Sequence, residues 1–81
     1  MYTYNTKGTC SIRITFDVVD NKLYNVNFLG GCRGNLQGIS KLVEGNNIDD
    51  VILRLKGIQC RNGTSCPDQL AKALEDYKAN N

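Results

Sequence analysis

The feature that most constrains the fold is an alternation of apolar and polar side chains between residues 10 and 28. From Cys10 to Val18 every second side chain is apolar, which places that set on one face of a β-strand. The residues from Asp20 to Lys22 predict a hairpin turn. The return strand carries apolar side chains at Tyr24, Val26 and Phe28. The sequence therefore predicts an antiparallel hairpin with one face in the core.

Three later segments carry apolar side chains at helical spacing, which predicts helices over 35–44, 48–56 and 69–79. The apolar positions of the first helix are Leu36, Ile39, Leu42 and Val43. Gly38 lies inside this helix, where we expect it to mark close packing against the sheet. Residues 2–6 predict a short edge strand before the hairpin. The predicted fold is a single α+β domain over 1–81, in which a small antiparallel β-meander is followed by three helices packed on one face.

Length and composition limit the function. A chain of 81 residues buries only roughly 60–65% of the surface that its unfolded form exposes, so its core is thin and a staple such as a bound metal would help it. The net charge of +2 and the scattered Lys and Arg residues predict no nucleic-acid partner. The sequence has no run of apolar residues long enough to span a membrane, and its N-terminus lacks the pattern of a signal peptide. We therefore expect a cytoplasmic protein.

The chain has four cysteines and no histidine, which excludes histidine catalysis and mixed Cys/His zinc sites. In the cytoplasm, cysteines are more often metal ligands or redox groups than disulfides. Four thiolates satisfy a tetrahedral zinc ion or hold an iron–sulfur cluster. The proposed ligands are Cys10, Cys32, Cys60 and Cys66, with zinc preferred and a cluster as the alternative. Simply buried thiols, a disulfide and redox chemistry remain as other interpretations.

Helix-start signals surround Cys66. Pro67 suits the first helical position, and Ser65 with Asp68 three residues later forms a variant of the capping box. The positive end of the helix dipole and the unpaired N–H groups favour a thiolate at Cys66. A thiolate binds metals and attacks electrophiles, so this end of the helix is the predicted centre of the chemistry.

A second motif is the glycine-rich segment 30–35, which precedes the first predicted helix. Such a loop can cradle a phosphate through its N–H groups, in which case Gly31, Arg33 and Gly34 would bind a nucleotide or phosphate. The simpler interpretation is a tight turn between strand and helix. Asp49 and Asp50 form a carboxylate pair, but their place in the first turn of a predicted helix explains them without catalysis.

Residues Thr64 to Asp68 spell the name of the TSCPD family, and the chain resembles a stand-alone member over residues 2–78. Gly30 to Cys32 before a helix, and Cys60 shortly before the motif, fit the same resemblance. In that family the domain also forms the C-terminus of cobalamin-dependent ribonucleotide reductases. The resemblance therefore implies a link to ribonucleoside-diphosphate reductase, nucleotide binding and DNA precursor synthesis.

The reductase activity itself is not carried over, because that reaction uses a large barrel that 81 residues cannot form. What the resemblance implies is a cysteine-rich metal-binding accessory module, non-catalytic by itself, with a ribonucleotide reductase or another enzyme as partner. Cys60 and Cys66 would be the reducing pair if the module instead served as a redox dithiol.

The order of the cysteines is also similar to that of U-type iron–sulfur scaffold proteins, which would make the chain a cluster scaffold or carrier. Those scaffolds carry an aspartate shortly after the first cysteine and a histidine beside the third. This chain departs from them, because Ser11-Ile12 follows Cys10 and the chain has no histidine. Finally, an exposed edge strand at residues 2–6 would allow a homodimer by strand pairing or swapping.

Overall fold

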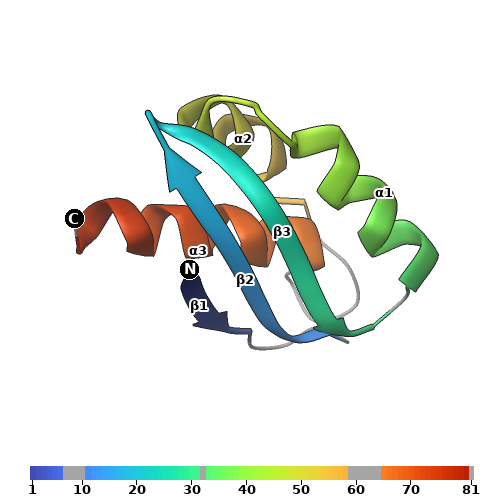
Figure 1. The fold of residues 1–81 in the computed structure, drawn as a ribbon. Helices are drawn as coiled ribbons and strands as arrows, with labels where there is room; N and C mark the ends of the chain where they lie inside the picture. Colours follow the sequence, from blue (N-terminus) through green and yellow to red (C-terminus); the bar gives the residue numbers. More distant parts are fainter. Residues whose placement is uncertain (7–10, 32, 59–64, 81) are drawn as a thin grey trace.

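Three strands form one antiparallel sheet in the computed structural model, which describes residues 1–6, 11–31, 33–58 and 65–80 (Figure 1). The strands are β1 (Tyr2–Asn5), β2 (Ser11–Val19) and β3 (Lys22–Gly30). Their order in the sheet is β1-β2-β3, and both pairs of neighbours are antiparallel. The predicted β-meander is confirmed.

The turn between β2 and β3 consists of Asp20 and Asn21, because Val19 pairs directly with Lys22. Both turn residues have positive φ, 53° and 63°. Two positive φ values in a two-residue loop define a type I′ turn, whose twist matches that of the flanking strands. Asp and Asn tolerate this conformation better than most residues, which is why the sequence signals the turn.

A β-bulge in β3 changes which side chains face the core. Thr15 pairs with Asn27 but Asp17 pairs with Tyr24, so β3 carries one extra residue at this point. Asn25 lies there with a φ of 56°. The extra residue shifts the alternation by one position, and Leu23 is fully buried while Tyr24 is only half-buried. The prediction that Tyr24 shares the core face with Val26 is therefore wrong.

The helices are α1 (Arg33–Val43), α2 (Ile48–Leu55) and α3 (Cys66–Ala79), which confirms the predicted order of strands and helices. In Figure 1, α3 runs behind the sheet, α1 lies beside β3, and α2 lies against α3. The core lies between these helices and the apolar face of the sheet. Its buried side chains are Ile14, Phe16, Leu23, Val26, Val43, Ile48, Val51, Leu70, Ala73 and Leu74.

Two expectations for α1 are wrong. A Cβ atom added to Gly38 would meet nothing within 4 Å, so no close packing requires glycine there. Leu42 is 79% exposed although its spacing predicts a buried position, while Leu36 and Val43 are buried. The reason is that α1 contacts mainly β3, so only a narrow stripe of its surface is covered.

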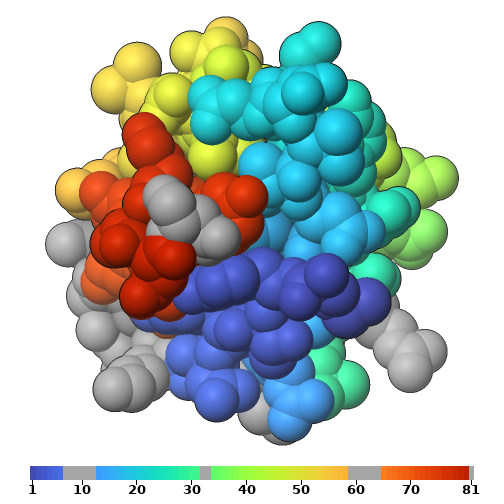
Figure 2. Space-filling model, turned by 60° about the vertical axis from the view of Figure 1, so that its left-hand side comes forward, coloured from blue at the N-terminus to red at the C-terminus, as the bar shows by residue number. Residues whose placement is uncertain are grey.

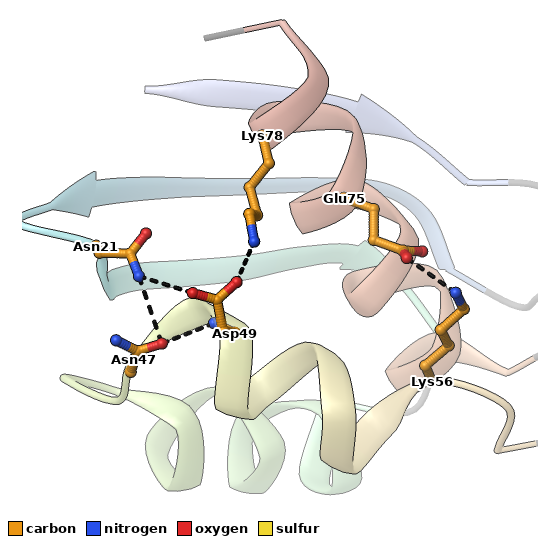
Figure 3. A network of polar contacts seen from close by, with 6 residues as sticks. All are labelled: Asn21, Asn47, Asp49, Lys56, Glu75 and Lys78. Atoms are coloured by element: carbon orange, nitrogen blue, oxygen red, sulfur yellow. Dashed lines mark hydrogen bonds and ion pairs between the residues drawn. The ribbon is translucent and has the colours of Figure 1, made fainter.

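Polar contacts fasten α2 to its neighbours (Figure 3). Asp49 accepts hydrogen bonds from Lys78 of α3 and from Nδ2 of Asn21 in the hairpin turn, the latter at 3.0 Å. These donors hold the pKa of Asp49 below its usual value, with the Lys78 bond as the main cause. Lys56 and Glu75 form a second link between α2 and α3, at 2.9 Å. Asp49 therefore has a structural role, as its position in a first helical turn predicts.

Among the helices of the described residues, none combines the length and the apolar character needed to cross a membrane.

Candidate metal centre

Cys66 is the first residue of α3, and the side chain of Ser65 caps the helix. The Ser65 Oγ accepts a hydrogen bond from the backbone N–H of Asp68 at 3.2 Å. Pro67 is the second helical residue rather than the first, and the helix begins three residues before the range of 69–79 that the apolar spacing predicts. Cys66 is only 7% exposed. Its predicted place at a helix N-terminus is confirmed, and the thiol is buried there.

Two hydrogen bonds join the start of α3 to the residues that follow α2. The Ser65 hydroxyl donates to the carbonyl oxygen of Ile58 at 2.6 Å, and Asp68 Oδ1 accepts from the backbone N–H of Gly57 at 2.7 Å. We call this pair of contacts the loop clamp. Cys60 belongs to the segment 59–64 between its two sides, and that segment lies outside the described residues. The loop clamp thus fixes both ends of the segment that carries Cys60.

Asp68 is 3% exposed and therefore needs partners for its charge. Besides the Gly57 N–H, Lys72 lies 3.4 Å from Asp68 Oδ2 and forms an i, i+4 pair with it. The sequence identifies Asp68 as a capping residue, but it does not reveal the contact with Gly57. That contact depends on how the chain returns from α2, which no local pattern in the sequence indicates.

Cys10 and Cys32 lie outside the described residues, but residues next to both are described. Ser11, which follows Cys10, pairs with Gly30 at the end of β3. Arg33, which follows Cys32, begins α1. The described residues contain no group of three or more His, Cys, Asp or Glu side chains that could hold a metal. Because three of the four predicted ligands lie outside them, the four-cysteine site stays a prediction.

The glycine-rich loop has a clear backbone reason for its composition. Gly30 and Gly31 have φ values of 80° and 81°, a region that L side chains rarely adopt. Gly34 lies within α1, where an added Cβ would meet nothing within 4 Å. The side chain of Arg33 lies outside what the structure describes. The turn from β3 to α1 therefore explains Gly30 and Gly31 without a ligand, and the predicted phosphate site at Gly31, Arg33 and Gly34 remains a prediction.

A family model for the TSCPD domain matches residues 2–78 of the chain. The chain belongs to the TSCPD domain family. No curated protein and no solved structure matches it significantly.

The structure shows where four of the five residues of the TSCPD motif lie and what they contact. Ser65 caps α3 and makes the loop clamp together with Asp68, Pro67 lies in the first turn, and Cys66 is buried as the first residue of the helix. Thr64 lies outside the described residues. In this TSCPD domain Ser65 and Asp68 therefore hold the backbone on both sides of Cys66 in place.

Proposed function

We propose that this TSCPD domain is a cysteine-rich metal-binding accessory module associated with ribonucleotide reductase, and that it is not catalytic by itself. Its ligands would be Cys10, Cys32, Cys60 and Cys66. The observation that carries the proposal is the buried Cys66 thiol at the N-terminus of α3, beside a loop clamp that fixes both ends of the segment containing Cys60.

The chemistry of Cys66 fits a metal ligand. A helix N-terminus stabilises negative charge, and a thiolate is the form of cysteine that binds metals. A thiolate that is 7% exposed pays a large desolvation cost unless a positive partner compensates it. A zinc ion would supply that charge, and structural zinc contributes on the order of 10 kcal/mol to the folding of small peptides. The thin core of a short domain makes such a contribution valuable.

The arrangement of the described neighbours supports a meeting of the cysteines. Ser11 and Gly30 are register partners, so the start of β2 and the end of β3 lie side by side. Both lie at the same end of the sheet in Figure 1, and α3 has its N-terminal end on the side where β3 leads into α1. The residues next to Cys10 and Cys32 in the sequence are thus at one end of the molecule.

The association with ribonucleotide reductase rests on the family. These 81 residues are too few to form the reductase barrel, so the role that we propose for this domain is an accessory one. Purified cobalamin-dependent reductase should shift the sedimentation of this protein if the two associate. Unchanged sedimentation at concentrations well above those in cells would refute this part of the proposal.

Elemental analysis of protein purified without added metal tests the metal site. We expect near-stoichiometric zinc, and a melting temperature that falls when a chelator removes it. Each single Cys→Ser variant should lose zinc, while Asp50→Asn, which removes an exposed carboxylate of α2, should keep it. Stoichiometric iron with a visible absorption band would identify an iron–sulfur cluster on the same ligands. Protein without zinc or iron, whose melting temperature ignores the chelator, would refute the metal site.

A further inference from the structure

The two edges of the sheet differ in how their backbone groups are paired. At the outer edge of β3, the N–H of Leu23 donates to the carbonyl oxygen of Asn46 at 2.9 Å. Its carbonyl oxygen accepts from the N–H of Gly45, and Lys22 forms an isolated bridge with Asn47. The connection between α1 and α2 therefore covers this edge at the start of β3.

The other edge is β1, which pairs only with β2 within the described part of the chain. An edge strand presents a row of N–H and C=O groups that can bind another strand. Proteins protect such edges with charged side chains or proline, but residues Tyr2 to Asn5 include neither. Figure 2 shows residues 1–6 at the surface beside the C-terminal end of α3. The edge is thus suited to pair with a strand that is also uncharged.

We propose that β1 pairs antiparallel with β1 of a second copy of this chain, which joins two sheets into one of six strands. The strand is its own best partner, since identical antiparallel strands pair about a two-fold axis and satisfy the same groups on both copies. This inference does not depend on the metal site.

The faces of β1 restrict the register of this pair. Tyr2 and Tyr4 are half-buried on the core face, while Thr3 and Asn5 are exposed on the other. Directly opposed residues in an antiparallel pair share a face, so the two-fold axis passes beside either Thr3 or Tyr4. In the first register Tyr2 opposes Tyr4, and in the second Tyr4 opposes its own copy. A tyrosine therefore meets a tyrosine across the joint in both registers, which is a favourable cross-strand pair.

The same restriction decides which substitutions break the dimer. In the first register Thr3 opposes Thr3 of the second copy. In the second register Thr3 opposes Asn5 of the second copy. Lysine at both positions, in the double variant T3K/N5K, places like charges opposite each other in either register, and this should weaken association about tenfold or more. The glutamate variant T3E/N5E should fail in the same way. A mixture of the two variants should associate again, because opposite charges then face each other.

Sedimentation velocity measures this over about 10 µM to about 1 mM, the range in which an interface of this small size associates. We expect the wild type to shift reversibly from monomer to dimer, both double variants to stay monomeric, and their mixture to recover the dimer. The control N35K/Q37K adds the same charge to exposed positions of α1 and should dimerise like the wild type.

A wild type that stays monomeric at the highest concentration would overturn the proposal, as would a T3K/N5K variant that still dimerises. A dimer that persists on dilution and does not exchange subunits would indicate a swapped strand and would also overturn it. Amide hydrogen exchange on the wild type gives a second test that needs no variant. Protection of the β1 amides should rise with protein concentration, and constant protection would contradict the strand pair.

Discussion

Replacing Asp68 with alanine removes one of the two hydrogen bonds of the loop clamp. Its carboxylate is 3% exposed and accepts from the Gly57 N–H at 2.7 Å. A hydrogen bond to a charged group contributes about 1.5–3 kcal/mol, and an acidic side chain in a first helical turn adds about 0.3–1 kcal/mol. The half-exposed Lys72 adds only a few tenths of a kcal/mol. Asp68→Ala should therefore lower the free energy of unfolding by about 2–4 kcal/mol.

Urea unfolding followed by far-ultraviolet circular dichroism measures this loss, in the presence of saturating zinc and again with a chelator. A domain of this length has a total stability of only about 4–12 kcal/mol, so the change is a large part of the whole. Asp68→Asn keeps an oxygen for the Gly57 N–H and should recover part of the loss. Asp50→Ala is the matched control, because Asp50 is an exposed acid in the first turn of α2. If Asp68→Ala costs no more than Asp50→Ala, the contact with Gly57 is not what makes Asp68 important.

Three further predictions concern other parts of the fold. Gly38→Ala should raise the free energy of unfolding by up to about 1 kcal/mol, because α1 has room for a methyl group there; a destabilised variant in urea unfolding would contradict this. Asn25→Val should be about 1–2 kcal/mol less stable than Asn25→Gly, since φ is 56° at the bulge and both variants lose the side-chain contact with Asp17; equal melting temperatures of these two variants would refute a role for the left-handed backbone. The lowered pKa of Asp49 stabilises the fold above the unfolded pKa of the carboxyl, and this contribution is lost as the pH falls through the folded value. Asp49→Asn should therefore flatten the acid limb of a plot of stability against pH, as should Lys78→Ala, and an unchanged limb in both would argue against the ion pair.

The hairpin could be predicted because its signals are local. Asp20 and Asn21 favour the backbone conformation of the turn that they form, and the predicted alternation in β2 is seen at Ile14, Phe16 and Val18, which lie on the core side. The face of Tyr24 could not be predicted, because the bulge depends on distant residues. The backbone N–H of Asn25 donates to Glu44 Oε1 at 2.9 Å, and its side chain donates to Asp17. No local pattern in the sequence predicts that Glu44, at the end of α1, will accept a hydrogen bond from the backbone of the extra residue in β3.

The candidate site likewise has some parts that the sequence predicts and others that it does not. The cap at Ser65 and the helix start near Cys66 depend on residues that are adjacent in the sequence, so the sequence predicts them. The contacts with Gly57 and Ile58 join the end of α2 to the start of α3, and they depend on a chain path that local propensities do not determine. The positions of Cys10, Cys32 and Cys60 remain predictions from sequence and family.

The loop clamp also sets the distance that the chain must span between Ile58 and Ser65. Because Gly57 and Ile58 are tied to Asp68 and Ser65, the span that the segment 59–64 bridges is set by its anchors rather than by its own residues. Even doubling the length of such a loop adds only about 0.6 kcal/mol of closure entropy. Insertions between Cys60 and Thr64 should thus cost the fold little, whereas the loss of Cys60 itself would remove a proposed metal ligand.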